Sequence, residues 1–591
     1  MFSTVLVANR GEIALRVMRA CKELGLRTVA VYSEADRDAL HVRYADDAYL
    51  IGPPPATESY LQIETIIDVA RRSGAGAIHP GYGFLAENAG FARACRDAGI
   101  VFIGPTPEAM DRMGGKVPAR NEAIAADVPV VPGTTEQVET ADEVRRLAES
   151  FGYPIAIKAS AGGGGRGLKV VTQPGEVQAA FESAKREAAA YFKNDEVYVE
   201  KYITDPRHIE IQVLGDTQGN VLYLGERDCS IQRRHQKLVE ESPSPAITPE
   251  IRSAMGAAAV RLAQRVGYTG AGTLEFLFED GQFYFLEMNT RIQVEHTVTE
   301  QITGIDLVKW QILVAQGEPL PWTQDQIQLR GHAIECRINA EDPADGFRPS
   351  LGTLTEYAEP HGFGVRVDSG YAQDLTIPQF YDSLVAKLVT WGQDRAEAIA
   401  RMRRALADFK IGGARTTIPF HQLVMDHPAF ASGDATIRFI GLHVTEADLK
   451  ALAQPELSAT SGDGEAVAVM RTFDVEVNGR RFQVRVAQPD APLAAPANNG
   501  AAAQARPRPG KAGKSKQHAA DPNAVVSPIQ GTVVAIRAQP GTQVEAGHVL
   551  FVVEAMKMEN EITAPRAGTI KEVRVAERAA VQSGEVLATL E

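Results

Sequence analysis

An internal repeat near the C-terminus constrains the fold of this chain more than any other feature of its sequence. Residues 528–554 match residues 565–591 at a constant offset of 37 positions, so that Gly531, for example, falls on Gly568. Each half alternates apolar and polar side chains over short stretches, as β-strands do. Two like halves predict a small, flattened β-barrel with approximate two-fold symmetry.

Lys557 lies between the two halves, in the sequence EAMKMEN of residues 554–560. The connection between like halves must be a tight, exposed turn, and a surface Lys is ordinarily a solvated charge. Solvation does not explain the two flanking Met residues, because exposed thioethers on a turn have no core to fill. The arrangement resembles the biotinyl domain of biotin-dependent carboxylases, in which the Lys of an Ala-Met-Lys-Met turn carries biotin. Lipoyl domains share the fold, but their modified Lys usually lacks the two Met neighbours.

The rest of the chain is long enough for several domains, since 591 residues correspond to about three to five domains. No stretch of about eighteen consecutive apolar residues is present, so we expect no membrane span. The net charge of −14 argues against nucleic acid as a partner. The N-terminus lacks the features of a secretion signal, and the four cysteines are scattered without metal-binding spacing. We therefore expect a cytoplasmic protein without disulfides.

The first 110 residues alternate between predicted strands and predicted helices. Strands are expected at 4–8, 28–32, 77–79 and 101–103, and helices at 13–24, 60–72 and 90–98. This order is typical of a parallel, doubly wound sheet. The first strand–helix junction, residues 9–12 (NRGE), lacks the Gly-x-Gly-x-x-Gly pattern, so we infer no dinucleotide site there.

A change of composition marks a boundary before the repeat. Residues 491–525 are rich in Ala, Pro and Gly with almost no large apolar side chain, which predicts a mobile linker. Just before it, two alternating stretches, residues 473–477 and 481–486, flank Asn478-Gly479, a strong signal for a β-hairpin. Because a lone hairpin is marginally stable, we expect it to pair with other strands or with a partner subunit.

A glycine-rich loop, residues 161–167 (AGGGGRG), lies between two predicted strands, residues 153–159 and 168–171. The glycines alone could equally belong to a plain linker. A Walker or Rossmann loop would open a helix instead. On a strand–loop–strand, glycines let backbone N–H groups approach phosphate oxygens from a flexible flap, and Lys158 adds a positive charge. The arrangement resembles the lid of ATP-grasp ligases.

Polar residues alternate within an apolar strand that precedes residue 296. Glu287, Asn289 and Arg291 project from one face, because alternate residues of a strand share a face. The simpler alternative is an edge strand with one solvated face. We favour oxygen ligands for Mg²⁺, because side chains this polar are costly to bury unpaired among apolar neighbours.

Glu275, on the preceding strand, completes this candidate metal site only if it shares a face with Glu287. Strand parity then requires a turn of odd length, and we expect the three-residue loop Glu279-Asp280-Gly281. A two-residue turn would send the two carboxylates to opposite faces.

Several motifs together resemble those of biotin carboxylases, which are ATP-grasp enzymes. The motifs are residues 9–14 (NRGEIA), 79–88 (HPGYGFLAEN), the glycine loop, 227–237 (RDCSIQRRHQK), 287–296 (EMNTRIQVEH) and 335–341 (ECRINAE). The resemblance runs from residue 1 to about 446, and the fusion to a linker and a biotinyl domain is similar to the alpha chain of bacterial acyl-CoA carboxylases. Thr297 departs from the family, which usually has Pro there, and Pro118 is also unusual.

The resemblance implies an α/β multidomain fold that ends in an all-β biotinyl barrel. The expected segments, in order, are a doubly wound N-terminal domain (1–112), an ATP-grasp lid (113–202), the ATP-grasp core with the α+β C-terminal carboxylase domain (203–446), a small β-rich subunit-interaction segment (447–490), the flexible linker (491–525) and the biotinyl carrier domain (526–591).

The resemblance also implies the site residues. Those expected to bind ATP are Lys116, Lys158, Gly163, Gly164, Gly165, Glu200, Lys201, Tyr202, Ile203, His208, Gln232 and His235. Those expected to hold Mg²⁺ or Mn²⁺ are Glu275, Glu287 and Asn289. Those expected to position bicarbonate are Lys237, Arg291, Gln293 and Val294. Glu295 would be the general base, Arg337 would stabilise the enolate of biotin, and Lys557 would carry biotin.

The expected reaction is ATP- and bicarbonate-dependent carboxylation of the chain's own biotin. Nothing between residues 447 and 525 is large enough to bind coenzyme A, so a separate carboxyltransferase (beta) subunit is expected, docked at the hairpin of residues 466–488. Acetyl- or propionyl-CoA is the expected acceptor, with methylcrotonyl-CoA or pyruvate as alternatives. The resemblance also implies a biotin protein ligase as partner and both homo- and hetero-oligomers. A non-catalytic carrier or scaffold is disfavoured by the intact set of charged site residues.

Overall fold

The computed structural model describes most of the chain. The described residues are 2–134, 137–159, 168–192, 196–453, 469–477, 480–488, 523–527, 531–555, 558–577, 579–581 and 584–591. Most of the predicted linker, the whole glycine loop of residues 161–167 and Lys557 therefore lie outside the described residues. Two compact units are distinguished, one built mainly from Met1–Gln454 and the other mainly from the C-terminal residues.

The N-terminal region is the parallel, doubly wound sheet that the sequence predicts. Its strands, ordered β3-β2-β1-β4-β5, are β1 (Thr4–Val7), β2 (Arg27–Ser33), β3 (Asp47–Gly52), β4 (Ala77–His79) and β5 (Val101–Phe102). Its helices are α1 (Gly11–Glu23), α2 (Leu40–Tyr44), α3 (Ile63–Ser73), α4 (Ala89–Asp97) and α5 (Pro107–Met113). The sequence did not predict β3, an edge strand whose side chains are mostly half-buried or exposed.

The chain itself covers the start of α1, where doubly wound sheets commonly bind ligands. Gly370 approaches this helix so closely that a Cβ there would lie 2.7 Å from the Glu12 backbone nitrogen and 2.9 Å from the Gly11 carbonyl carbon. Asn9 ties the neighbouring loop down by donating to the carbonyls of Pro80 at 2.7 Å and Tyr82 at 2.8 Å.

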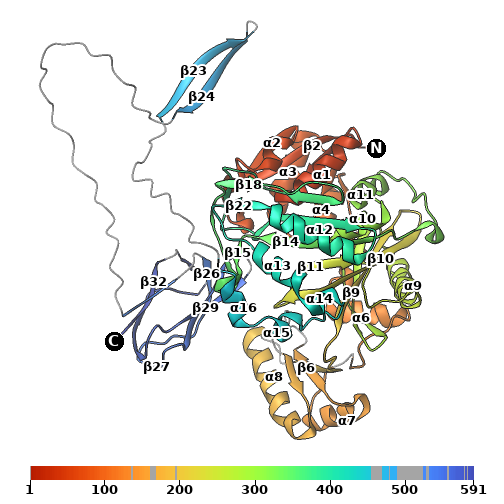
Figure 1. Cartoon of the computed structure of the whole chain (residues 1–591), viewed down its shortest axis with the longest axis vertical. Coiled ribbons are helices and arrows are strands. Elements are labelled where there is room, and N and C mark those ends of the chain that lie inside the picture. Colours follow the sequence, from red (N-terminus) through yellow and green to blue (C-terminus); the bar gives the residue numbers. More distant parts are fainter. Residues whose placement is uncertain are drawn as a thin grey trace, which may run out of the picture. The chain divides into compact units, whose positions relative to one another are not determined.

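A small antiparallel sheet, ordered β7-β6-β8, follows. It contains β6 (Ile155–Ala159), β7 (Leu168–Val171) and β8 (Val197–Lys201), and α7 (Ala141–Phe151) and α8 (Val177–Phe192) lie against it (Figure 1). The strand–loop–strand prediction is confirmed, because β6 and β7 pair with Lys158 opposite Leu168. Pro118 lies in the first turn of α6 (Lys116–Ala125), where a missing N–H costs no helical hydrogen bond.

One continuous eight-stranded sheet carries most of the candidate site residues. Its strands, in spatial order, are β13 (Gln282–Asn289), β12 (Gly270–Glu279), β9 (Arg207–Gly215), β10 (Val221–Arg233), β11 (Gln236–Ser242), β14 (His332–Asn339), β21 (Leu384–Gly392) and β19 (Val365–Ser369). Helices that pack on it include α9 (Pro249–Arg265), α10 (His296–Thr303), α11 (Leu307–Ala315) and α12 (Arg395–Asp408). α12 contacts β14 and β21, and it lies beside β14 in Figure 1.

Short elements complete this unit. They are the strands β15 (Glu341–Asp342), β16 (Arg348–Pro349), β17 (Gly352–Thr353), β18 (Glu356–Ala358), β20 (Thr376–Ile377) and β22 (Lys410–Gly412), and the helices α13 (Ile418–Asp426), α14 (Pro428–Ala431), α15 (Phe439–His443) and α16 (Glu446–Ala451). The four cysteines are free and buried. None of the described helices combines the length and the hydropathy needed to cross a membrane.

The turn between β12 and β13 differs from the three-residue loop that parity required. Glu279 pairs with Gln282, so the turn has two residues, Asp280 and Gly281, and both have the positive φ of a type I′ turn. The predicted loop length is therefore wrong. A register shift between Glu275 and Phe276 inserts Leu286 as a bulge, and this extra residue restores the parity. Glu275 pairs directly with Glu287, so the two carboxylates share a face after all.

The predicted hairpin before the linker forms from β23 (Val469–Val477) and β24 (Arg480–Gln488). No other strand among the described residues pairs with it, and pairing with a partner subunit, the second expected arrangement, stays a prediction.

The C-terminal repeat is confirmed strand by strand. The strands are β25 (Ala524–Val526), β26 (Gly531–Ile536), β27 (Gln543–Val544), β28 (Val549–Ala555), β29 (Met558–Thr563), β30 (Gly568–Val573), β31 (Ala580–Val581) and β32 (Val586–Leu590). β26, β27 and β28 begin 37 residues before β30, β31 and β32. The two sheets, β25-β32-β30-β27 and β29-β28-β26-β31, exchange under this offset, and the equivalent residues Leu550 and Leu587 are both fully buried. β28 ends at Ala555 and β29 begins at Met558, on either side of the Met556-Lys557 pair.

Candidate active site

Lys237, near the start of β11, is the centre of the site. Its Nζ lies 2.5 Å from Glu210 Oε2, 2.9 Å from Glu275 Oε1 and 2.7 Å from Glu295 Oε1. Burial alone would lower the pKa of Lys237, but these carboxylates outweigh burial and raise it well above the usual range. Three strands and one loop therefore converge on a permanently charged ammonium group.

Arg227 on β10 forms the floor of the site. Its side chain is fully buried, and all five of its N–H donors are used. The acceptors are Glu210 Oε1 at 2.5 Å, Gln212 Oε1 at 2.6 Å, Thr299 Oγ1 at 2.9 Å, Thr273 Oγ1 at 3.0 Å and Gln293 Oε1 at 2.9 Å. This fixed fork holds Glu210 against Lys237 and orients Gln293.

The candidate metal ligands meet across β12 and β13. Glu275 Oε1 accepts hydrogen bonds from Asn289 and from Gln293, each at 2.9 Å, in addition to its contact with Lys237. Glu287, directly opposite Glu275, is exposed. The face thus presents oxygen donors of the kind that Mg²⁺ prefers.

His208 on β9 borders the same carboxylates. Its Nε2 lies 2.8 Å from Glu275 Oε2, and ligand atoms of His208, Glu210 and Glu275 lie within 4.8 Å of one another. Burial opposes a charge on His208, but Glu275 outweighs it and raises the pKa of His208.

Glu295 and Arg337 face each other beside Lys237. Glu295 directly precedes α10, and its Oε2 accepts from Arg337 Nη2 at 2.9 Å. Burial would raise the pKa of Glu295, but Lys237 and Arg337 hold it well below its usual range. Arg337 also donates from Nε to Glu240 Oε1 at 2.6 Å. Glu295 is therefore a carboxylate at neutral pH, which a general base must be.

Arg291 and Val294 lie in the loop that leads from β13 to Glu295. Arg291 donates from Nε to Glu87 Oε2 and from Nη2 to Asn289 Oδ1, each at 2.9 Å. Lys387 Nζ, fully buried on β21, donates to the Val294 carbonyl at 3.1 Å. Two side chains from distant parts of the sequence thus fix this loop.

The predicted ATP residues are only partly brought together. Lys158 Nζ contacts Glu200 Oε2, and Arg120 Nη1 lies 3.2 Å from Glu200 Oε1. Lys201 donates instead to the carbonyls of Gly152 and Tyr153, each at 3.0 Å. Lys116 begins α6, and Tyr202 and Ile203 follow β8. Gly163, Gly164 and Gly165 lie outside the described residues.

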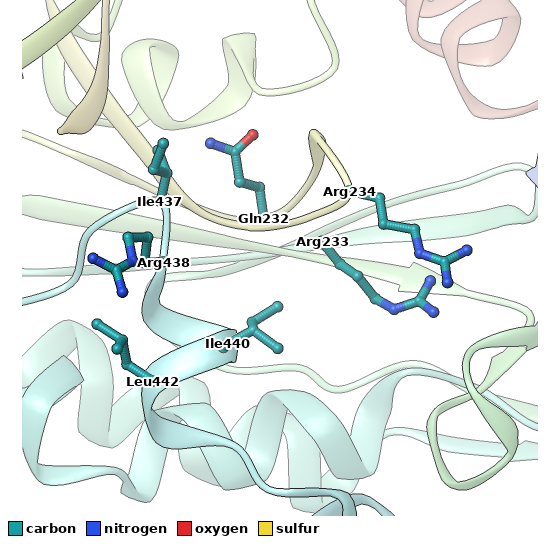
Figure 2. A pocket seen from close by; sticks show the side chains of 8 residues that line it. Gln232, Arg233, Arg234, Ile437, Arg438, Ile440 and Leu442 are labelled. Atoms are coloured by element: carbon teal, nitrogen blue, oxygen red, sulfur yellow. The ribbon is translucent and has the colours of Figure 1, made fainter. Parts of the chain in front are cut away.

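A hollow of about 330 Å³ lies beside the β10–β11 hairpin. Gln232 contributes to it, and Figure 2 shows Arg233 and Arg234 from the hairpin opposite Ile440 and Leu442 of α15. The hairpin turn consists of Arg234 and His235, which both have positive φ, at 49° and 66°. Non-glycine residues in this conformation are strained, and such strain concentrates at functional sites.

Sequence reasoning missed five residues that hold the predicted ones in place. They are Glu87, Glu210, Arg227, Glu240 and Lys387. Glu87 and Arg227 lie within the motifs already quoted, whereas Glu210, Glu240 and Lys387 lie outside them. No local pattern shows which cation each carboxylate contacts. Their partners are set by the pairing of strands far apart in the chain.

Four family descriptions match the chain. Residues 1–110 match the N-terminal domain of biotin carboxylase, and residues 115–323 match the ATP-binding domain of the carbamoyl-phosphate synthase L chain. Residues 335–441 match the C-terminal domain of biotin carboxylase, and residues 523–590 match the description "biotin-requiring enzyme". A biotin carboxylase of Nostoc sp. is 57% identical over 440 residues, which cover 74% of this chain and 98% of the relative. The chain belongs to the biotin carboxylase family.

This biotin carboxylase is also similar to proteins with further parts or bound ligands. The biotin-dependent acyl-coenzyme A carboxylase alpha3 subunit of Mycobacterium leprae is 47% identical over 563 residues, covering 95% of this chain and 94% of the relative. The biotin carboxylase domain dimer of Hydrogenobacter thermophilus 2-oxoglutarate carboxylase was solved with MgADP, ADP and bicarbonate. It is 51% identical, with a TM-score of 0.70, and covers 75% of this chain and 98% of that chain. The predicted fold class and the predicted biotin carboxylase with a fused biotinyl carrier domain are confirmed.

Proposed function

We propose that this biotin carboxylase is the alpha subunit of an acyl-CoA carboxylase, with acetyl- or propionyl-CoA as acceptor. The observation that carries the proposal is the extent of the likeness to the M. leprae alpha3 subunit. That likeness spans 95% of this chain, including the carrier domain, whereas the Nostoc biotin carboxylase matches 74%. The acyl-CoA would bind to a separate carboxyltransferase subunit, for which the β23–β24 hairpin is our candidate docking element.

Glu295 acts as the base that takes the bicarbonate proton in this proposal. Its carboxylate lies between Lys237 at 2.7 Å and Arg337 at 2.9 Å, so it is ionised and its orientation is fixed. Lys237 and Arg291 place positive charge where phosphate and bicarbonate oxygens would gather, which favours a transition state that spreads negative charge. Arg337 supplies a permanent cation on the side of Glu295 that would face biotin.

The donor set fits Mg²⁺, which the family implies. Glu275, Glu287 and Asn289 offer carboxylate and amide oxygens on one face, and so few protein ligands leave positions for the phosphates of ATP. A bound Mg²⁺ would neutralise phosphate charge during phosphoryl transfer. Biotin would be carried on Lys557, between β28 and β29.

Reconstitution tests the acceptor. The biotinylated chain is mixed with each candidate carboxyltransferase, and ATP-dependent fixation of labelled bicarbonate is measured with acetyl-CoA, propionyl-CoA, methylcrotonyl-CoA, pyruvate or 2-oxoglutarate. Label should enter acetyl- or propionyl-CoA, and a Lys557→Arg chain should serve as the blank. If label were found only in pyruvate or 2-oxoglutarate, the acyl-CoA acceptor would be refuted and the chain would belong to a 2-oxo-acid carboxylase.

Assembly is tested in the same preparation. We propose that the chain forms homo-oligomers and joins the carboxyltransferase through residues 469–488. A chain that lacks this hairpin should keep carboxylating free biotin but should fail to co-purify with its carboxyltransferase. Co-purification of the shortened chain would remove the hairpin as the docking element.

A further inference from the structure

Glu240 and Glu335 form a buried carboxyl pair beside Arg337. They are directly paired residues on the antiparallel strands β11 and β14, and both are 0% exposed. Opposite residues of an antiparallel pair project from the same face, with Cβ atoms roughly 4.5–5.5 Å apart. Two carboxyl groups therefore share one dry space next to a cation of the active site.

Each carboxyl group has one oxygen engaged and one oxygen unpartnered. Glu240 Oε1 accepts from Arg337, and Glu335 Oε2 accepts from the hydroxyl of Thr297. Among the side chains that the structure describes, Glu240 Oε2 and Glu335 Oε1 are buried and take part in no hydrogen bond. One proton between these two oxygens would satisfy both, because a protonated carboxyl donates and a carboxylate accepts.

The charges around the pair agree with one retained proton. Burial and then the charge of Glu240 raise the pKa of Glu335 well above its usual range. Burial raises the pKa of Glu240 to about 7, although Arg337 lowers it. The other charged groups that face the pair are Glu295, Lys237 and Lys387. Two full negative charges on directly opposed, buried side chains are unfavourable.

We propose that Glu240 and Glu335 share one proton and that this pair, with Thr297, consists of positioning residues for Arg337. The inference rests on the proposed function, in which Arg337 faces biotin. With one negative charge on the pair, Glu240 and Glu295 hold the guanidinium between them at 2.6 and 2.9 Å without a further uncompensated anion.

Thr297 sets which oxygen of Glu335 carries the proton. Its hydroxyl occupies Oε2, so the proton is left to Oε1. Thr297 also lies two residues after Glu295, and Glu335 lies two residues before Arg337. Two hydrogen bonds therefore join the start of α10 to β14, one between Thr297 and Glu335 and the other between Glu295 and Arg337.

Infrared difference spectroscopy tests the shared proton in the full chain without turnover. A protonated carboxyl has a C=O stretching band that a carboxylate lacks. The wild-type spectrum minus that of Glu335→Gln at pH 7 should contain one such band. In Glu240→Gln the band should shift, because the proton would then face an amide oxygen. An unchanged spectrum in either variant would overturn the shared proton.

Kinetics test whether the pair positions Arg337. Glu335→Leu should lower kcat/KM for free biotin about tenfold or more, since a hydrogen bond near a charged group is lost. Glu335→Gln should recover most of that loss, because its amide can donate where the proton did. Glu240→Gln should raise KM for biotin and leave KM for ATP nearly unchanged.

Glu341→Gln is the matched control, because Glu341 is another buried carboxyl but accepts from Ser383 and Asn339 instead of Arg337. It should remove a band of its own and leave the biotin kinetics unaltered. Equal losses in Glu335→Gln and Glu335→Leu would overturn the positioning role. Absence of biotin carboxylation in the wild type would refute the proposed function instead, while the infrared result would stand by itself.

Discussion

Replacing Lys387 by Met should impair the use of bicarbonate more than the use of biotin. Lys387 is fully buried on β21, and its Nζ donates to the Val294 carbonyl at 3.1 Å and lies 3.2 Å from Glu12 Oε2. Val294 is joined directly to Glu295, so this hydrogen bond fixes the peptide that carries the proposed base. Met fills a similar volume without the charge, so the substitution removes the contact and keeps most of the packing.

The magnitude follows from the loss of one hydrogen bond from a charged donor, about 1.5–3 kcal/mol. That range corresponds to roughly a 10- to 150-fold loss in kcat/KM for bicarbonate. The two carboxylates near Lys387 add little further cost, because Asp368, 3.8 Å from Lys387, keeps both of its hydrogen bonds from Arg366, and Glu12 can become neutral. Burial raises the pKa of Glu12 to about 7 even though Lys387 lowers it. Without Lys387 the pKa rises further, so Glu12 becomes neutral at pH 7 and leaves no unpaired buried charge.

ADP release measured against bicarbonate concentration, at saturating ATP and free biotin, provides the assay. Lys450→Met is the matched control, since Lys450 is exposed on α16 and, among the described residues, forms an ion pair with Glu446 alone. The double variant Lys387→Met/Glu12→Gln should behave like Lys387→Met, because Glu12 is already neutral there. If kcat/KM for bicarbonate in Lys387→Met stayed within about twofold of wild type, well below the loss expected for one charged hydrogen bond, the reasoning would be refuted.

Three further variants test other parts of the chain. Lys557→Arg should keep the charge but abolish biotin attachment on a streptavidin blot, and persisting biotin would move the attachment site elsewhere. Glu295→Gln should leave ATP binding nearly intact while suppressing bicarbonate-dependent ADP release; wild-type activity would exclude Glu295 as the base. Burial raises the pKa of Glu341 from 4.5 to about 7, so its contribution to stability is greatest below pH 4.5 and is lost as pH rises through 7. Glu341→Gln should therefore raise the thermal midpoint at pH 8, by the equivalent of up to about 3 kcal/mol, and change it little at pH 4; equal shifts at both pH values would contradict this.

Features encoded by local periodicity could be predicted from the sequence. The offset of 37 residues reappears as paired strands, because each half carries its own alternation of buried and exposed side chains. The alternation of strands and helices in the first 110 residues likewise fixes a parallel sheet. β3 was not predicted, because an edge strand with few fully buried side chains lacks the apolar run that marks a buried strand.

The turn between β12 and β13 shows where local reasoning stops. Asp280-Gly281 is the strongest sequence signal for a two-residue turn, and the structure follows it. Strand parity argues against that turn, because a two-residue turn between regular strands places Glu275 and Glu287 on opposite faces. The bulge at Leu286 removes the conflict, and a bulge depends on how two strands pair across their length, which no short window of sequence reveals.

The arrangement of the site depends on strand order, which explains why its supporting residues were missed. Glu287, Glu275, Glu210, Arg227, Lys237 and Arg337 come from β13, β12, β9, β10, β11 and β14, six neighbouring strands of one sheet. At roughly 4.8 Å between strands, these side chains extend over about 24 Å. Lys237 connects the two sides of the site, since it contacts Glu275 on the proposed metal side and Glu295 on the proposed biotin side. A change that moves Lys237 should therefore disturb nucleotide and biotin kinetics together, whereas changes at Glu287 or Arg337 should separate them.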